Sequence, residues 1–259
     1  MTPAAVLELE HIAVSFGGIH AISDLTFAVG EGELVSLIGP NGAGKTTAFN
    51  AISGFIHPSR GKIIYRGRPI NGLKPHQVAA LGLLRTFQRT SLFERESVFQ
   101  NVLTGLHLQG KRKSWEYLLA LPRVAAEEAA LRTKAYEILD FVGLSSRASD
   151  LAGTLPYGEQ RLLGVGIALA ARPKLLMLDE PVSGMNPTET ARFMAMLRNI
   201  RRDGLSVLLV EHDMRMVMSV SDRVIALNYG NVIAEGSPAE IQAHPEVIQI
   251  YLGHGARHA

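Results

Sequence analysis

The chain has 259 residues, 47% of them hydrophobic, which is enough apolar surface for a sizeable core in one or two domains. Its 26 basic and 24 acidic side chains leave a formal net charge of +2, so charge gives no general case for binding nucleic acid. The absence of cysteine excludes a disulfide scaffold and a cysteine zinc site. The start, MTPAAVLELE, lacks the basic and apolar regions of a secretory signal, so a cytoplasmic protein is expected.

The first elements along the chain alternate between apolar and polar residues. Residues 6–16 and 25–29 follow this alternation, which predicts short strands of an antiparallel sheet. Residues 34–55 then pass from an apolar strand through a glycine-rich turn into a helix. Short, continuous apolar strands follow at 174–181, 206–213 and 223–230, between helical stretches. Strands that alternate with helices in this way indicate an α/β fold.

The middle of the chain, about residues 88–165, lacks such strands. Helical periodicity is clear at 97–108 and 124–144, so we expect a helical subdomain inserted into a single domain of residues 1–259. The longest apolar runs, such as 162–171, are far shorter than the ~20 residues of a membrane helix. No membrane span is therefore expected.

Two further segments contain residues that could bind a metal or contact a membrane. The tail 253–259 carries two histidines among small residues and is expected to be a frayed end rather than a metal site. In the segment 110–129, Lys111, Arg112 and Lys113 stand beside Trp115. These residues form either a solvated face or a contact with anionic headgroups or a membrane protein's loop.

The strongest local signal is GPNGAGKT, which lies between an apolar strand and a helix and fits a phosphate-binding loop. Gly42 and Gly44 let backbone N–H groups curl around phosphate oxygens at a helix N-terminus, and Lys45 adds positive charge. Thr46 offers its hydroxyl to Mg²⁺. The residues that we expect to contact the nucleotide here are Gly39, Pro40, Asn41, Gly42, Ala43, Gly44, Lys45, Thr46 and Thr47.

A second motif, the acidic pair at the end of the strand in LLMLDEP, indicates a nucleotide hydrolase. Its apolar strand ends at Asp179, which can hold the Mg²⁺ shell. The adjacent Glu180 is then able to orient or deprotonate a water molecule. The two neighbouring carboxylates therefore take two different tasks.

In this order, these elements resemble the ATP-binding subunits of ABC transporters, and the resemblance covers essentially the whole chain. It implies a P-loop NTPase core with an N-terminal antiparallel β subdomain and an inserted helical subdomain, an ABC ATPase fold that binds ATP and Mg²⁺. Phe16 lies where this family stacks an aromatic ring on adenine. Gln88 in RTFQ is similar to the family's glutamine that senses Mg²⁺ and water, and His212 in VEHD is similar to its γ-phosphate histidine. The resemblance thus assigns catalytic roles to Lys45, Gln88, Glu180 and His212, and metal contacts to Thr46, Gln88 and Asp179.

The segment LPYGEQ, residues 155–160, lies where the family's LSGGQ signature opens a helix and contacts the γ-phosphate held by the opposite subunit. The resemblance therefore implies that Tyr157, Gly158 and Glu159 bind nucleotide in trans. Pro156 replaces the signature serine and cannot donate a hydrogen bond. Its fixed φ suits the first turn of a helix.

Several departures from the general pattern occur together and resemble the branched-chain amino-acid importer ATPases: RTFQ followed by LF, the tyrosine in the signature, SGMNP, and HPEVIQIYLG. In SGMNP, Asn186 replaces the aspartate through which many relatives communicate between the two sites. The resemblance implies a second ATPase subunit, expected to be a paralogue in a heterodimer, with two transmembrane permease subunits and an extracytoplasmic substrate-binding protein. It implies a peripheral location on the cytoplasmic face of the inner membrane, and no nucleic acid partner.

Other functions stay open from the sequence alone. An importer of another small solute, such as urea or short amides, and an exporter of lipid-like cargo would use the same ATPase. A soluble ABC scaffold is disfavoured because no sustained heptad run appears. A regulator that does not hydrolyse ATP is disfavoured because Glu180 and His212 are both present.

Overall fold

The computed structural model describes residues 5–86, 92–107 and 122–252. Gln88, the basic residues 111–113 with Trp115, and the tail 253–259 lie outside these ranges. The chain forms two compact units: the first comprises Met1–Arg85, Lys174–Pro181 and Leu197–Ala259, and the second comprises Thr86–Pro173 and Val182–Met196.

The first unit is built on a single sheet. Within the described residues, ten strands follow the order β5-β4-β1-β2-β10-β9-β3-β8-β7-β6. Their bounds are β1 (Ala5–Phe16), β2 (Ile19–Gly30), β3 (Leu34–Ile38), β4 (Arg60–Tyr65), β5 (Arg68–Pro69), β6 (Leu83–Thr86), β7 (Leu175–Asp179), β8 (Ser206–Val210), β9 (Arg223–Asn228) and β10 (Asn231–Gly236).

The sheet has an antiparallel half and a parallel half, and the strands of the two halves differ in how many of their faces are buried. β1 pairs antiparallel with β2 and β4, and only one face of these strands needs to be apolar. β3, β7 and β8 pair in parallel and every residue in them is buried, which explains their continuous apolar sequences. A parallel pairing of β10 with β2, at Asn231 and Asp24, joins the two halves.

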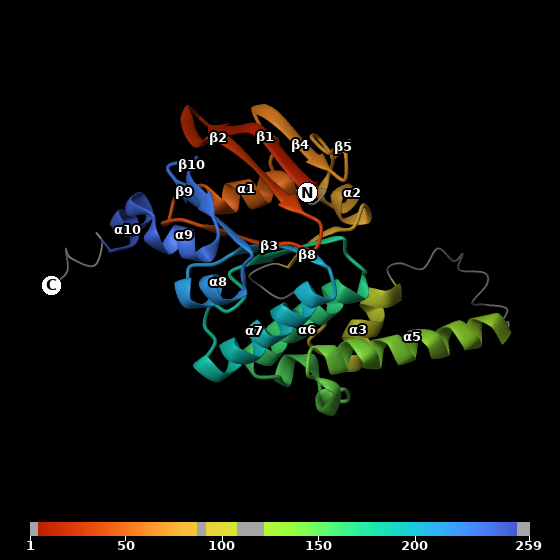
Figure 1. The fold of residues 1–259 in the computed structure, drawn as a ribbon. Coiled ribbons are helices and arrows are strands. Elements are labelled where there is room, and N and C mark those ends of the chain that lie inside the picture. The colour runs from red at the N-terminus through yellow and green to blue at the C-terminus, as the bar shows by residue number, and fades with distance from the viewer. Residues whose placement is uncertain (1–4, 87–91, 108–121, 253–259) are drawn as a thin grey trace. The chain divides into compact units, whose positions relative to one another are not determined.

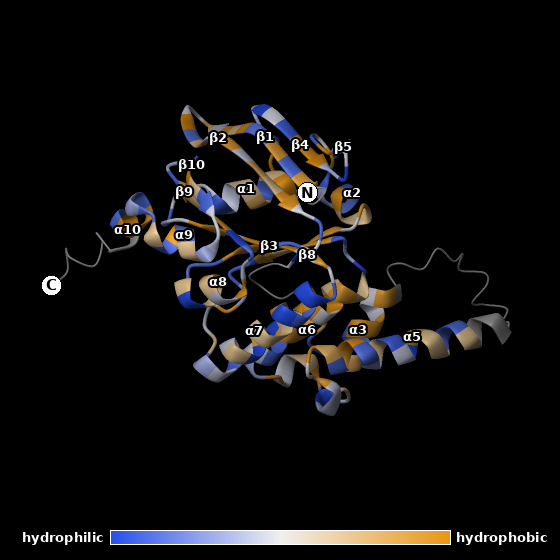
Figure 2. Ribbon diagram, in the orientation of Figure 1, coloured by the Kyte–Doolittle hydropathy of each residue, from blue (hydrophilic) through white to orange (hydrophobic). Residues whose placement is uncertain are grey.

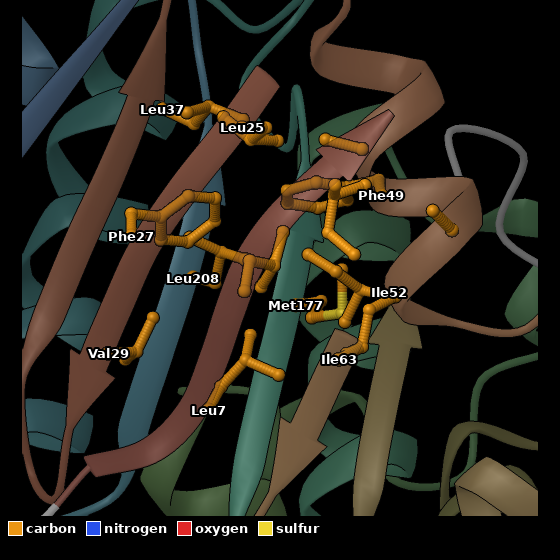
Figure 3. Packing of buried hydrophobic residues seen from close by; sticks show 14 of the residues in the cluster. Leu7, Leu25, Phe27, Val29, Leu37, Phe49, Ile52, Ile63, Met177 and Leu208 are labelled. Carbon is orange, nitrogen blue, oxygen red and sulfur yellow. The ribbon is translucent and has the colours of Figure 1, made fainter. Parts of the chain in front are cut away.

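Helix α1 (Lys45–Ile52) packs between the two halves of this sheet (Figure 1). Phe49 and Ile52 are fully buried and lie beside Ile63 of the antiparallel half and Met177 of the parallel half (Figure 3). This packing stabilises the helix, since eight residues would be too few for an isolated helix in water. The core of the unit therefore fixes the helix that follows the glycine-rich loop.

Shorter helices complete the first unit. Two of them have clear start signals: Asp213 caps α8, and Ser237 forms a capping box with Glu240 at α9. The helices are α2 (Pro75–Ala80), α8 (Met214–Val220), α9 (Pro238–Ala243) and α10 (Pro245–Leu252).

The second unit is helical, and its described residues contain α3 (Val98–His107), α5 (Pro122–Phe141), α6 (Tyr157–Ala170) and the part of α7 (Pro187–Arg202) up to Met196. Short 3₁₀ turns lie at Ser145–Arg147 and Ala152–Thr154. Polar and apolar residues both occur along α5 (Figure 2), and Ala135 and Leu139, which lie one turn apart, are buried. The unit is wider than the expected range 88–165, since it reaches Pro173 and takes in 182–196.

Helices α3 and α6 approach each other closely at a glycine. A Cβ atom on Gly105 of α3 would lie 2.9 Å from the carbonyl oxygen of Ile167. On α6 itself, a Cβ on Gly166 would meet Ile138 at an ordinary 3.5 Å. Gly105 therefore lets α3 approach α6 closely, whereas Gly166 of α6 lies against α5. None of the described helices combines the length and the apolar character needed to cross a membrane.

Candidate functional site

The glycine-rich loop joins β3 to α1 and has the backbone shape of a phosphate cradle. Gly39, Gly42 and Gly44 have φ values of +154°, +83° and +104°, a region that favours glycine. A Cβ on Gly39 would lie 2.4 Å from the carbonyl oxygen of Leu227, and one on Gly44 would lie 2.8 Å from that of Ala21. At Gly42, by contrast, the same Cβ would meet nothing within 4 Å. The loop is therefore fixed by close backbone contacts at Gly39 and Gly44 and is open at Gly42.

Lys45 lies at the start of α1 and is folded back over the loop. Its side-chain Nζ donates hydrogen bonds to the carbonyl oxygens of Gly39 at 2.6 Å and Pro40 at 3.0 Å. Burial lowers the pKa of Lys45 below its ordinary value, while the charges of Glu180 and Asp179 act in the opposite direction. A phosphate oxygen is a stronger partner for the ammonium group than these neutral carbonyls. Lys45 is therefore positioned so that a phosphate could replace the two carbonyl oxygens as its hydrogen-bond partner.

The acidic pair follows β7 as expected. Asp179 is 5% exposed, and its Oδ2 accepts a hydrogen bond of 2.7 Å from Nη2 of Arg85. Glu180 has a φ of +45°, which is unusual for a residue with a side chain, and its N–H donates to the carbonyl oxygen of Val210 at 2.9 Å. This bond fixes the turn at the end of β7. Strained backbone of this kind is common at functional sites.

His212 follows β8, and its two acidic neighbours fix the turn. Glu211 is fully buried and accepts hydrogen bonds from the N–H groups of His212 at 3.0 Å and Asp213 at 3.4 Å. Asp213 accepts from Arg215 and Met216 at the start of α8. The side chain of His212 remains 62% exposed, with Nδ1 at 3.7 Å from Glu211 Oε2. Sequence reasoning proposed His212 as a site residue and did not predict the hydrogen bonds of Glu211 and Asp213 that fix this turn.

Most of the other sequence-predicted residues of the first unit are at least partly exposed. Asn41, Gly42 and Thr46 are exposed, whereas Pro40, Gly44 and Thr47 are partly exposed and Ala43 is buried. Phe16, at the end of β1, is 50% exposed, so its ring is partly accessible. Because β3, β8 and β7 are adjacent and parallel, the loop, Glu180 and His212 all follow the same carboxyl edge of the sheet. This edge is where open α/β sheets bind their ligands.

The residues of this edge are compatible with Mg²⁺ bound together with a nucleotide. No group of three or more His, Cys, Asp or Glu side chains that could hold a metal occurs within the described parts of the chain. Mg²⁺ is commonly held by one or two protein oxygens and by the phosphates of its substrate. Asp179 and the exposed Thr46 supply such oxygens. Gln88, the third residue assigned to the metal, lies outside the described residues.

The segment LPYGEQ lies in the second unit, at the start of α6. Pro156 is the N-cap, with φ −53° and ψ 151°, and its carbonyl oxygen accepts the N–H of Gln160 at 3.0 Å. It therefore precedes the first turn, which corrects the expectation that its φ serves within that turn. No side chain caps the helix at this residue. The N–H groups of the first turn thus lack the usual cap, as in helix ends that bind anions.

Tyr157 is packed against its own chain. The residue is exposed, at 45%, and the guanidinium of Arg161 lies 4.9 Å from the ring centroid. Arg161 Nε also donates to the tyrosine hydroxyl at 3.0 Å. The ring also lies near Gly184, where a Cβ would lie 3.4 Å from the ring. The tyrosine thus links α6 to the SGMNP turn.

Gly158 makes a close contact that the sequence did not reveal. A Cβ at this residue would lie 2.6 Å from the carboxyl carbon of Glu189. Glu189 accepts the N–H of Asn186 at 2.9 Å, and Asn186 Oδ1 accepts the N–H groups of Thr188 and Glu189, both at 3.0 Å. Asn186 and Glu189 therefore form a reciprocal cap at the start of α7, and this cap lies against Gly158.

Glu159 brings a negative charge to the first turn of α6, but two arginines offset it. Its carboxylate lies 3.4 Å from Arg147 Nε and 3.9 Å from Arg192 Nη1, and its side chain is 15% exposed. Neither arginine was identified from the sequence. The pairing reduces the repulsion that a bare carboxylate would exert on a phosphate.

Comparisons with known proteins agree with this geometry. Residues 22–183 match the family model of ABC transporters, and residues 231–257 match that of branched-chain amino acid ATP-binding cassette transporters. The chain is 40% identical over 249 residues to the high-affinity branched-chain amino acid transport ATP-binding protein BraF of Pseudomonas aeruginosa, covering 96% of this chain and 98% of BraF. It is 38% identical, with the same coverage, to LivG of Escherichia coli, which has the same description. A crystal structure of MJ1267, an ATP-binding cassette of an ABC transporter in its ADP conformation, is 29% identical with a TM-score of 0.83 and covers 96% of this chain and 99% of MJ1267.

Proposed function

The chain belongs to the ABC transporter family, and on that premise we propose that it is the ATP-hydrolysing subunit of an importer of branched-chain amino acids. The observation that carries the proposal is the carboxyl edge of the sheet, where the phosphate loop, Glu180 and His212 follow adjacent strands. The names of its relatives favour branched-chain amino acids over urea, short amides or lipid-like cargo. The ATPase activity itself is a property of the family.

In this mechanism each residue at the edge has a separate task. Lys45 leaves its two loop carbonyls and, with the loop N–H groups, binds the outer phosphates. Glu180 orients a water molecule and accepts its proton, and His212 contacts the γ-phosphate. Phe16 stacks on the adenine ring. Thr46, Asp179 and Gln88 would hold Mg²⁺, which supplies positive charge for the phosphate oxygens.

The second unit contributes to a site on another subunit. Tyr157, Gly158 and Glu159 at the start of α6 bind the nucleotide of the partner in trans, so that ATP closes the dimer and hydrolysis reopens it. The partner is a paralogous ATPase, and the pair drives two transmembrane permeases that receive substrate from an extracytoplasmic binding protein. In this proposal the chain lies at the cytoplasmic face of the inner membrane.

The first test is Glu180→Gln, with Lys45→Ala for comparison. The amide keeps the shape of the carboxylate but accepts no proton, so we expect ATP binding close to that of the parent and a loss of hydrolysis of about 10²-fold or more. Lys45→Ala should instead weaken ATP binding, which equilibrium binding of a fluorescent ATP analogue measures. If Glu180→Gln hydrolysed ATP within a few-fold of the parent rate, Glu180 would not be the general base.

The second test addresses the cargo. The chain is purified together with its permeases and reconstituted with the binding protein, and uptake of labelled leucine, urea and acetamide is compared. We expect uptake of leucine that depends on ATP and is lost with Glu180→Gln. Uptake of urea or acetamide in place of leucine would support the alternative importers.

A further inference from the structure

Arg85, the first residue of RTFQ, is a buried cation to which no role has been assigned so far. It lies in β6, next to the acidic end of β7, and its side chain is 8% exposed. Its guanidinium donates to Asp179 Oδ2 at 2.7 Å, to Asn50 Oδ1 at 2.7 Å and to Ser53 Oγ at 3.3 Å. The ring of Phe49 lies 5.5 Å from the guanidinium carbon. One side chain therefore joins β7 to α1.

The contacts on α1 share one side of the helix. Asn50 lies four residues after Thr46 and Ser53 lies seven after it, so the three residues occur along the same face. Thr46 is the α1 residue assigned to the metal, and Asp179 is the β7 residue assigned to it. Arg85 thus ties the Thr46 face of α1 directly to Asp179.

The bond from Arg85 engages one carboxylate oxygen of Asp179. Within the described residues no hydrogen bond reaches the other oxygen, Oδ1. A planar guanidinium that is itself fixed by Asn50 and Ser53 restricts rotation of the carboxylate. The arrangement therefore holds Oδ2 on the protein and leaves Oδ1 for a metal or its water shell.

We propose that Arg85 is a positioning residue that sets the spacing and orientation of Asp179 relative to Thr46, and so determines the affinity of the site for Mg²⁺. This inference rests on the proposed function, because it presupposes that Mg·ATP binds at the loop. Partners that orient metal-binding groups commonly change metal affinity by about 10- to 100-fold when they are removed. Arg85 acts through Asp179 and is not assigned a contact with the nucleotide.

The test uses Arg85→Met, Arg85→Lys and Asn50→Ala in the assembled transporter. Methionine keeps apolar bulk but has no donors, so the Mg²⁺ concentration for half-maximal ATPase activity should rise about tenfold or more. Lysine keeps the charge without the two-pronged geometry and should restore part of this loss. Asn50→Ala removes one of the two hydrogen bonds at α1 and leaves the bonds to Ser53 and Asp179, so its effect should be smaller than that of Arg85→Met. Arg68→Met, at an exposed arginine of β5, is the matched control and should match the parent.

A second readout separates positioning from general damage to the fold. Binding of a fluorescent ATP analogue is measured with Mg²⁺ and with EDTA, and thermal unfolding is followed in EDTA. We expect Arg85→Met to weaken binding about tenfold with Mg²⁺ but less than twofold in EDTA. Equal losses in both conditions, or an unchanged Mg²⁺ requirement, would overturn the proposal. Failure of the parent to bind ATP in either condition would instead refute the proposed function.

Discussion

At the scale of single residues, Pro156 is the clearest departure from the family signature. The serine that it replaces would donate a hydroxyl hydrogen bond to the γ-phosphate of the partner, whereas Pro156, as the N-cap of α6, has no donor. A hydrogen bond to a charged group contributes about 1.5–3 kcal/mol. That free energy corresponds to roughly a ten- to hundredfold change in affinity.

Pro156→Ser should therefore lower the ATP concentration that half-closes the dimer by about ten- to a hundredfold. The measurement is an ATP titration of hydrolysis and of dimer closure in the assembled transporter. Serine is also a favourable N-cap, so the free energy of unfolding of the isolated subunit should increase by about 1 kcal/mol. Thermal unfolding measures this effect separately from ATP affinity. An unchanged apparent ATP affinity would mean that the helix N-terminus and the Gly158 amide make the contact alone.

The residues of the site could be predicted from the sequence only in part. The loop 39–46, Asp179 and Glu180 are local motifs whose spacing carries the chemistry, and the structure places them after β3 and β7. Arg85 was not predicted because its partner Asp179 is 94 residues away and no local pattern records the pairing. The signal that remained was the arginine of RTFQ itself, since a buried cation needs a carboxylate partner.

At the scale of elements, the start of α6 and the start of α7 depend on each other. The contact is between Gly158 and Glu189, whose carboxylate is already held by the N–H of Asn186. Helix periodicity predicted both helices, but their ends meet through a glycine and a cap that are 31 residues apart. Sequence reasoning predicted that Gly158 contacts the nucleotide, and the structure places Gly158 against this cap.

The dependence predicts a reversal of sign in a double-mutant cycle. Gly158→Ala places a Cβ 2.6 Å from the Glu189 carboxyl carbon, so Glu189 must give up its bond to Asn186 and the subunit should lose stability. In the background of Glu189→Ala the obstacle is gone, and alanine should stabilise the helix by up to about 1 kcal/mol relative to glycine. Thermal or urea unfolding of the isolated subunit measures all four proteins. Equal effects of Gly158→Ala in both backgrounds would exclude the coupling.

At the scale of the whole molecule, the sequence predicted both the sheet and the helical unit. It did not predict the order of the strands or the full extent of the helical unit. Alternating and continuous apolar strands could be distinguished in the sequence because they meet different burial demands. The order of the strands could not be predicted, since the two halves of the sheet are joined by a pairing of β2 with β10, more than two hundred residues apart. The same non-local character explains why residues 182–196 were not expected among the helices of the second unit.

The two units also carry complementary halves of the proposed ATP sites, which predicts how activity depends on concentration. The first unit holds the loop, Glu180 and His212, whereas the second holds LPYGEQ, which the family uses on the opposite subunit. At high dilution the isolated chain should therefore hydrolyse ATP slowly, and addition of its paralogue should raise the rate until the two are present in equal amounts. A paralogue whose own catalytic glutamate is replaced by glutamine should still stimulate the chain, because it supplies only its signature helix to the site that contains Glu180. A specific activity that is independent of dilution and insensitive to the paralogue would show that one chain completes its own site.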